Sequence, residues 1–420
     1  MNDLYYKRDD CRLCGSVDLD LAVPLAPIPI ATPNFSIPDD DRDSPFFREA
    51  VPLDLYLCRD CGHLQVLHVA NPEVQYGNYV YTTSLSLGLA DHFQAYADTV
   101  LAARSPASDS LVVEFGSNDG TLLKCFKEKG MRVVGVDPAR AIAEQATRSG
   151  IETLNAFFSL DIARQIRENH GPAGIIIANN VIANIDDMVP VALGVKELMA
   201  PDGVFVFETQ YGADVIKDKL LDTVYHEHLS YFNVRPLAAF FERHGMQVID
   251  VEHIETKGGS IRVTVQHSGG PDTVSAVATE ALEEEDNDGL NSLGCYQGFS
   301  DEVEALRSRL NAIADEQRGA GRTLGGYGMS VGTTTLLAQF GLTEKIDFLF
   351  DDDPDKESAL SGPGYDIPVF GSEAVYEKNP GAIIVFAWRY AEPIMAKHER
   401  YLKDGGVFII PLPEVTIKKA

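Results

Sequence analysis

The sequence predicts an α/β fold with two successive Rossmann-like units behind a cysteine-rich N-terminal region. Two series of short apolar strands alternate with amphipathic helices, which is typical of a parallel sheet covered by helices. The first series holds LVVEFG, RVVGVD, GIIIANN and GVFVFE, and the second holds TLGGYG, KIDFLFDD, AIIVFAW and GVFIIPL. Four of the six cysteines precede both series.

Changes in composition set the expected boundaries of these units. Residues 1–70 are rich in proline and loop residues, residues 71–275 hold a helical lead-in and the first series, and residues 276–420 hold the second. The segment IRVTVQ, which starts at Ile261, is assigned to the first series as a late strand. The acidic stretch 283–291 is expected to be a linker or an exposed loop.

Composition limits the classes of partner. The chain has 420 residues, of which 45% are hydrophobic and 23% charged, and its formal net charge is −28. This charge argues against general binding to nucleic acid or to anionic membranes, although a few local donors can still hold a small anion. The N-terminus is polar and no apolar run approaches the ~20 residues of a membrane-spanning helix. We therefore expect a soluble, cytoplasmic protein whose cysteines are reduced or bound to metal.

Two CxxC pairs point to a metal site. They are Cys11-Arg-Leu-Cys14 and Cys58-Arg-Asp-Cys61, separated by a long spacer. Each pair can place two thiolates on one cation, and four thiolates complete a tetrahedral zinc site. Four protein ligands leave no open position, so the predicted zinc is structural rather than catalytic. The alternative is two unrelated pairs or disulfides, and a cytoplasmic location disfavours disulfides.

A glycine-rich turn follows the first apolar strand and opens a helix. Its candidate cofactor-binding residues are Glu114, Gly116, Asn118 and Gly120. Glycines let the backbone approach a ligand closely, and the helix N-terminus offers free N–H groups. An acidic residue before the glycines favours the cationic S-adenosylmethionine over a dinucleotide, whose pyrophosphate it would repel. The alternative is a tight turn that binds no ligand.

The ends of the next two strands supply further candidates. Asp137 ends the strand RVVGVD, where a carboxylate can accept hydrogen bonds from both ribose hydroxyls of a bound nucleoside. Asn179 and Asn180 close the strand GIIIANN. Ligands bind at this carboxyl edge in open α/β sheets, so all three residues are expected at the cofactor site.

The run Tyr225-His226-Glu227-His228 concentrates ionisable groups after the strand GVFVFE. Carbon methylation next to a ketone needs a base for the α-proton and a donor for the enolate oxygen, and His and Tyr suit these roles. A helical run would place Tyr225 and His228 on one face, whereas an extended run would pair His226 with His228. The alternative is a pair of surface or packing histidines.

Several of these motifs together resemble the sugar C-methyltransferase family, whose members methylate dTDP-linked 4-keto-deoxyhexoses. The motifs that carry the resemblance are CRLCG, VPLDLYLCRDCGHLQ, EFGSNDG, DTVYHEHLSYF and KGGSIRV. They span nearly the whole chain. The resemblance implies an N-terminal zinc-binding region, a central S-adenosylmethionine-binding methyltransferase domain, and a C-terminal Rossmann-like domain that helps to hold the sugar nucleotide.

The resemblance also implies residue roles. It implies that His228 is the base and that Tyr225 and Glu227 lie in the active site. A family tyrosine that follows the zinc region maps to Tyr79, with two neighbouring tyrosines, at positions 76 and 81, as competitors. In the resulting hypothesis the base removes the α-proton with help from Glu227 or Tyr79, while Tyr225 and Asn180 steady the enolate.

Three positions depart from the family pattern, and two alternative functions accompany them. Asn184 stands where the family commonly has His, Lys257 where it has the His of HGGS, and Gly332 where it has Lys. A relative with altered catalysis and a different small-molecule acceptor is therefore one alternative. The other is an NAD-binding oxidoreductase, because GYGMSVG followed by the acidic run 351–353 imitates a dinucleotide fingerprint, although its spacing is GxGxxxG.

Overall fold

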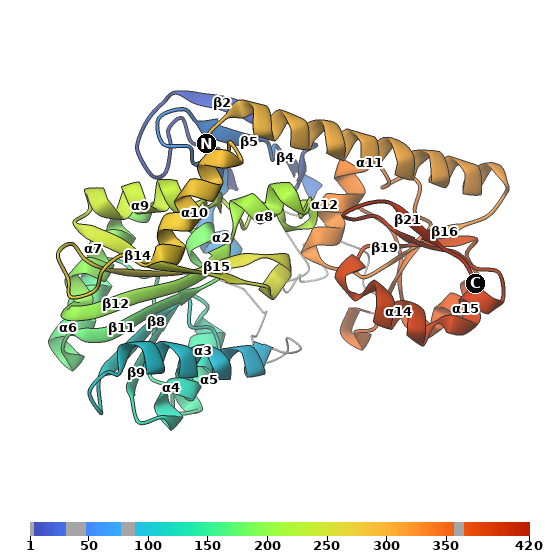
Figure 1. Cartoon of the computed structure of the whole chain (residues 1–420). Coiled ribbons are helices and arrows are strands. Elements are labelled where there is room, and N and C mark those ends of the chain that lie inside the picture. Colours follow the sequence, from blue (N-terminus) through green and yellow to red (C-terminus); the bar gives the residue numbers. More distant parts are fainter. Residues whose placement is uncertain (1–3, 31–47, 77–88, 357–364) are drawn as a thin grey trace.

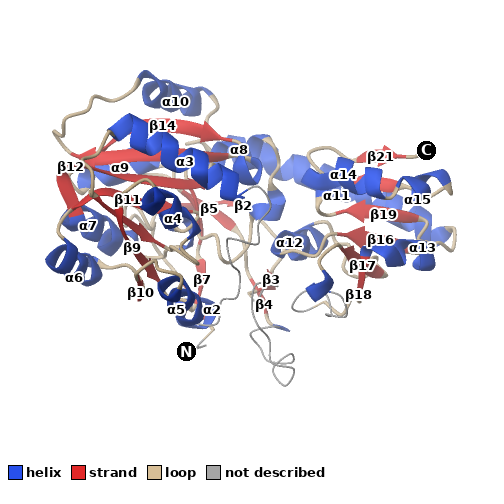
Figure 2. Cartoon of the chain, turned by 90° about the horizontal axis from the view of Figure 1, so that it is seen from below, coloured by secondary structure: helices blue, strands red, loops and turns tan. Residues whose placement is uncertain are grey.

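Figure 1 shows a computed structural model that describes residues 4–30, 48–76, 89–356 and 365–420. A central unit built on a large sheet lies beside a smaller C-terminal α/β unit, and the cysteine-rich N-terminal strands lie against both (Figures 1 and 2). The α/β fold class with two Rossmann-like units is confirmed. Among the described residues, no helix combines the length and apolar character needed to span a membrane.

The central sheet has seven strands in the order β10-β9-β8-β11-β12-β15-β14. β8 to β12 run parallel, whereas β15 is antiparallel to both of its neighbours. The order reverses between β8 and β11, which makes the carboxyl ends of these two strands the expected ligand site. The strands are β8 (Leu111–Phe115), β9 (Arg132–Asp137), β10 (Thr153–Asn155), β11 (Ala173–Asn179), β12 (Met199–Gln210), β14 (Met246–Ile254) and β15 (Ser260–His267).

Helices cover both faces of this sheet, because alternate strand residues are apolar on each side. α3 and α4 bury one face, and α6, α7, α9 and α10 bury the other. The helices are α3 (Leu89–Arg104), α4 (Thr121–Glu128), α5 (Arg140–Arg148), α6 (Leu160–His170), α7 (Met188–Leu198), α8 (Gly212–Lys217), α9 (Val234–Arg243) and α10 (Ala276–Asn287). The expected linker at 283–291 is therefore wrong in its first part, because α10 continues to Asn287 with Glu285 buried against α9.

The N-terminal unit is a set of short antiparallel strands. Its largest sheet has the order β13-β6-β5-β2, and β13 is contributed by the central unit. The elements are β1 (Tyr5–Lys7), β2 (Leu19–Val23), β3 (Ile28–Pro29), β4 (Ala50–Val51), β5 (Leu55–Cys58), β6 (Leu64–Val66), β7 (His68–Ala70), α2 (Pro72–Tyr76) and β13 (Ser230–Tyr231). A strand borrowed from residues 230–231 ties this unit to the segment that follows the ionisable run.

The C-terminal unit repeats the doubly wound pattern on a smaller scale. Its sheet has the order β18-β17-β16-β19-β20-β21 and is parallel except for β21. Its elements are α11 (Leu293–Gly319), β16 (Leu324–Tyr327), α12 (Val331–Gln339), β17 (Phe348–Asp351), β18 (Val369–Gly371), α13 (Val375–Lys378), β19 (Ala382–Val385), α14 (Ala391–Lys397), α15 (Glu399–Lys403), β20 (Phe408–Ile410) and β21 (Thr416–Lys418).

One apolar core joins all three units. It combines side chains of β2, β5 and β6 with residues near η4 (Leu221–Thr223), one face of α11 and the inner face of α12. The long helix α11 contacts β2, α8 and β16, and Figure 1 shows it crossing from the N-terminal strands to the C-terminal unit. This shared core packs the three units against one another.

Candidate functional site

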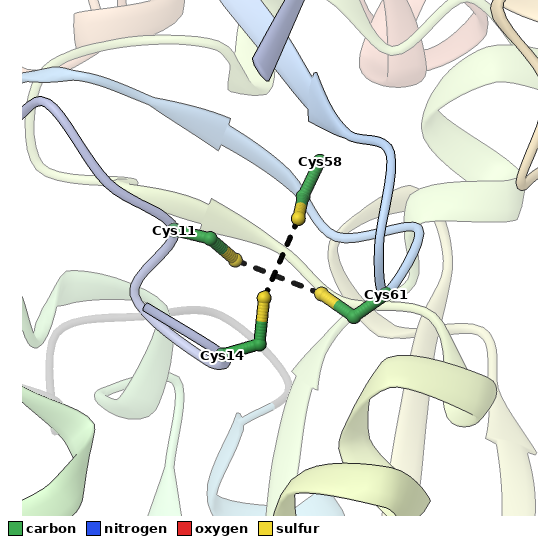
Figure 3. Close-up of side chains that lie close together, drawn as sticks. All are labelled: Cys11, Cys14, Cys58 and Cys61. Carbon is green, nitrogen blue, oxygen red and sulfur yellow. Dashed lines mark hydrogen bonds between the residues drawn. The ribbon is translucent and has the colours of Figure 1, made fainter. Parts of the chain in front are cut away.

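The four cysteines of the two CxxC pairs form one cluster (Figure 3). The Sγ atoms of Cys11 and Cys61 are 3.6 Å apart, those of Cys14 and Cys58 are 3.4 Å apart, and all four lie within 4.8 Å of one another. Zn–S bonds of about 2.3 Å in a tetrahedron place sulfur atoms roughly 3.8 Å apart, so the cluster fits zinc. None of the four is in a disulfide, and four protein ligands make the zinc structural.

The cavity that the predicted site residues line lies between the central sheet and the C-terminal sheet. Its volume is about 540 Å³, within the range of ligand sites. The carboxyl ends of β8, β9, β11 and β12 form one wall, and the turn between β16 and α12 forms the opposite wall. The predicted site residues on its surface are Gly116, Asn118, Asp137, Asn179, Asn180, Tyr225, Glu227 and His228.

Asp137 organises the glycine-rich turn. One of its carboxylate oxygens accepts a hydrogen bond from the backbone N–H of Asn118 at 2.8 Å, and the other accepts from Ala139 at 2.9 Å. Burial raises the pKa of Asp137, and these two backbone donors oppose that shift. A carboxylate has about four acceptor positions, so two remain for a ligand's hydroxyls. Gly116 has φ +67° and a Cβ there would lie 2.7 Å from Val181, which explains the need for glycine.

The other cofactor candidates divide into two groups. Glu114 and Gly120 are not among the residues that line the cavity. Glu114 is buried, and burial together with nearby Asp137 holds its pKa well above the usual range. Asn179 lines the cavity, and its Nδ2 has no partner among the described residues, which leaves a donor for a ligand.

Tyr225 and His228 form a hydrogen-bonded pair on the cavity wall. His228 Nδ1 lies 2.8 Å from the carbonyl oxygen of Thr223, and only a protonated nitrogen can donate to that acceptor. Nε2 is then the unprotonated nitrogen, and it lies 3.1 Å from the hydroxyl of Tyr225. The pKa of Tyr225 is raised well above 10 by burial and by Glu227, so its hydroxyl keeps its proton and donates. The run is a turn, in which the His228 N–H reaches the Tyr225 carbonyl oxygen.

His226 points the other way, toward the N-terminal unit. Its Nε2 lies 3.3 Å from the carbonyl oxygen of Ile28 and 3.2 Å from that of Val51. The side chain is buried, and burial lowers the pKa of His226 to about 4. His226 is therefore a neutral structural donor between two backbone segments, and it does not line the cavity.

Of the tyrosines expected after the zinc region, one can be placed at the cavity. Tyr79 lies outside the described residues. Tyr76, one of its competitors, ends α2 and lines the cavity beside Glu227, whose charge, together with burial, raises the Tyr76 pKa well above 10. Asn184 also lines this wall.

Several cavity residues were missed by the sequence reasoning. Thr209 and Gln210 end β12, and the rule that ligands bind at carboxyl strand ends would have identified them. The C-terminal unit contributes the start of α12 and two cations, Lys356 and Arg389. Arg389 Nη1 lies 2.6 Å from a carboxylate oxygen of Asp222 in the central unit. No sequence signal pairs residues 167 positions apart.

Comparisons with known proteins cover the whole chain. Residues 11–76 match a zinc binding domain family, residues 89–251 a methyltransferase domain family, and residues 255–413 the C-methyltransferase C-terminal domain family. The chain is 34% identical to the C-methyltransferase NovU of Streptomyces niveus over 421 aligned residues, which cover 100% of this chain and 99% of the relative.

Two solved methyltransferase structures align with part of the chain. Magnesium protoporphyrin IX methyltransferase from Synechocystis with bound SAH is 16% identical, covers 44% of this chain and 89% of its own, and gives a TM-score of 0.34. The glycopeptide N-methyltransferase MtfA with sinefungin is 12% identical, its alignment covers 41% of this chain and 86% of that protein, and its TM-score is 0.33.

Proposed function

This chain belongs to the C-methyltransferase family, and from that premise we propose that it methylates the carbon next to the ketone of a nucleotide-linked keto-deoxysugar. The activity itself, S-adenosylmethionine-dependent C-methylation, follows from the full-length relative and the matched domains. The single observation that carries the finer proposal is the Tyr225–His228 pair, whose Nε2 is an unprotonated base on the wall of the cavity.

His228 is the proposed general base. Its Nδ1–H is held by the Thr223 carbonyl oxygen, so Nε2 is the nitrogen that would take the α-proton of a substrate once the Tyr225 hydroxyl turns aside. A ketone next to the C–H bond is essential, because only the enolate spreads the developing charge onto oxygen. Glu227 lies on the same wall and can stabilise the imidazolium that forms.

The enolate oxygen needs donors. Tyr225 retains its proton, because burial and Glu227 raise its pKa, and its hydroxyl can move from His228 to the enolate oxygen. Asn180 lies on the cavity wall and offers an amide donor. Tyr79 remains a proposed helper of the base.

The cofactor is proposed to lie against the central sheet. Asp137 would hold the ribose hydroxyls with its remaining acceptor positions, while Gly116, Asn118 and Asn179 shape and hydrogen-bond the nucleoside site, with Glu114 and Gly120 supporting the turn. S-adenosylmethionine, when bound, supplies the electrophilic methyl group that the enolate carbon takes up.

The nucleotide is proposed to lie against the C-terminal unit. The N-terminus of α12 opens onto the cavity, and helix N-termini favour anions. Lys356 and Arg389 add two cations to the same wall. A diphosphate is the part of a dTDP-linked 4-keto-deoxyhexose that needs such donors; in the structure Lys356 pairs with Asp351 and Arg389 with Asp222.

Mass spectrometry tests the proposal directly. We expect a mass gain of one methyl group when the protein is incubated with S-adenosylmethionine and a nucleotide-linked 4-keto-deoxysugar, and none with the matched sugar reduced to the 4-hydroxyl. In deuterated solvent without cofactor, the α-proton of the keto sugar should exchange. Methylation of the reduced sugar at an equal rate, or on oxygen, would refute the proposal.

A further inference from the structure

We call the two CxxC segments, Cys11–Cys14 and Cys58–Cys61, the zinc knuckles. The first of them carries a buried arginine that is not a metal ligand. Arg12 lies between Cys11 and Cys14, and only 3% of its surface is exposed. A guanidinium costs much free energy to bury unless it is paired and hydrogen-bonded. The groups that satisfy it therefore indicate what the knuckle is built to hold.

Its partners belong to two segments that line the cavity. Arg12 Nε donates to a carboxylate oxygen of Asp186 at 3.0 Å, and Asp186 follows the cavity loop that contains Ala183 and Asn184. Arg12 Nη1 donates to the backbone carbonyl oxygen of Leu229 at 3.2 Å, and Leu229 directly follows His228. One planar side chain thus bridges the two segments.

The peptide groups beside His228 are held from several sides. The Leu229 N–H donates to the carbonyl oxygen of Ala183 at 2.7 Å, and the Leu229 carbonyl oxygen also accepts from Val66 N–H at 2.9 Å. The next residues, Ser230 and Tyr231, form β13 and pair with β6 of the zinc-binding unit. The chain on the carboxyl side of His228 is therefore built into the sheet that the zinc knuckles flank.

The side chain of Gln65 fixes the arginine in turn. Its Oε1 accepts from the Arg12 backbone N–H at 3.1 Å and from Arg12 Nη1 at 2.9 Å. Gln65 lies in β6, opposite Ser230 of β13. A lysine at position 12 would keep the charge but could not donate in these directions at once, because the planar fork is specific to arginine.

We propose that Arg12 is a positioning residue that couples the zinc-binding unit to the base His228. Arg12 holds two backbone segments in place, the cavity loop that precedes Asp186 and the segment that follows His228. The imidazole of His228 can then meet the substrate carbon in the geometry that the reaction needs. The inference rests on the proposed role of His228. A base misplaced by about 1 Å loses on the order of 10²-fold in rate, even when both ligands still bind.

The test compares Arg12→Lys with a matched control, Arg8→Lys. Arg8 also pairs with Asp186, through Nη1 at 3.2 Å, but its other side-chain partner is Asp10 rather than Leu229. We expect Arg12→Lys to lower kcat and substrate α-proton exchange together, by about 10- to 100-fold. KM, cofactor affinity by calorimetry and zinc content should stay within about twofold, and Arg8→Lys should change kcat much less.

Further variants separate the possible failures. Asp186→Asn, which keeps the shape and weakens the ion pair with Arg12, should lower kcat in the same direction and serves as the test if Arg12→Lys does not fold. Normal kcat in both variants, or a fall in zinc content and cofactor affinity parallel to kcat, overturns the inference. The variant His228→Ala distinguishes the two proposals. If His228→Ala has normal turnover, the proposed base is wrong. If His228→Ala is inactive while Arg12→Lys has normal turnover, only the positioning role of Arg12 is refuted.

Discussion

At the scale of single residues, two histidines two positions apart have opposite environments. His228 shares the cavity wall with Tyr225, whereas His226 is buried between the carbonyl oxygens of Ile28 and Val51. The sequence left open which of them faces the substrate, because a helical run and an extended run give different pairings. The structure has a turn, which no periodicity encodes, and it places Tyr225 with His228.

The first prediction concerns the base. If His228 is the proposed base, His228→Ala should lower turnover by about 10²–10⁴-fold, the contribution of a positioned general base. Cofactor affinity should be nearly unchanged, because the proposed base acts on the sugar and not on the nucleoside. His226→Ala should be much milder in turnover once protein stability is matched. Steady-state kinetics and cofactor calorimetry check both. If His226→Ala is the more damaged enzyme, the assignment of the run is wrong.

The second prediction concerns pH and His226. Its folded pKa of about 4 lies below the ordinary value of 6.5, so the unfolded chain takes up the proton first as the pH falls. Neutral His226 makes its full contribution to the free energy of unfolding above pH 6.5. This contribution, on the order of 3 kcal/mol, is lost as the pH falls from 6.5 to about 4. His226→Gln keeps a donor but does not titrate, so its melting temperature should fall less than that of wild type over this range. Parallel curves would contradict this.

At the scale of elements, strands and glycine turns were predictable and their supporting contacts were not. Apolar periodicity located β8, β9, β11 and β12, and the turn after β8 was evident from its glycines. The helix α10 was not predicted, and its last turn was taken for a linker because its surface is acidic, although Glu285 is buried and caps α9 by accepting from two backbone N–H groups. In a sequence, a buried acidic cap cannot be told from a solvated charge.

The third prediction concerns the zinc knuckles. Cys58→Ser should lower zinc content below one per chain and reduce the melting temperature, because metal binding and folding of the knuckles are linked. Cys125→Ser is the control, since Cys125 lies in α4 away from the cluster. Metal analysis and calorimetric melting check the pair. Equal zinc content in both variants, or four thiols that react freely in the native wild type, would contradict a zinc site made of four cysteines.

At the scale of the whole molecule, the cavity exists because two sheets present their carboxyl edges to each other. Each edge could be predicted from its own strands, but their meeting depends on packing between distant segments. A Cβ on Gly332 would lie 2.5 Å from the Asp222 carbonyl oxygen, so the start of α12 can approach the central unit only with glycine there. A side chain at this position would therefore require the two units to shift, and Arg389 supplies a cation at the same wall.

The last prediction follows from the proposal that the cofactor lies on the wall formed by the central unit and the sugar nucleotide on the wall formed by the C-terminal unit. Asp137→Ala should weaken cofactor binding by about 1–3 kcal/mol, because ribose hydroxyls lose a charged acceptor, and should leave the KM of the nucleotide-linked sugar nearly unchanged. Arg389→Ala should do the reverse, raising the sugar's KM by about tenfold or more through loss of a charge-assisted contact.

The two variants are best measured in one assay, with the cofactor and the sugar varied in turn. Because Arg389 also pairs with Asp222, the double variant Arg389→Ala/Asp222→Asn separates loss of the anion contact from an unpaired carboxylate. If the raised KM persists in the double variant, the arginine contacts the sugar nucleotide. If Asp222→Asn restores the KM, the loss came from the unpaired carboxylate, and Arg389 acts by neutralising Asp222 rather than by contacting the diphosphate.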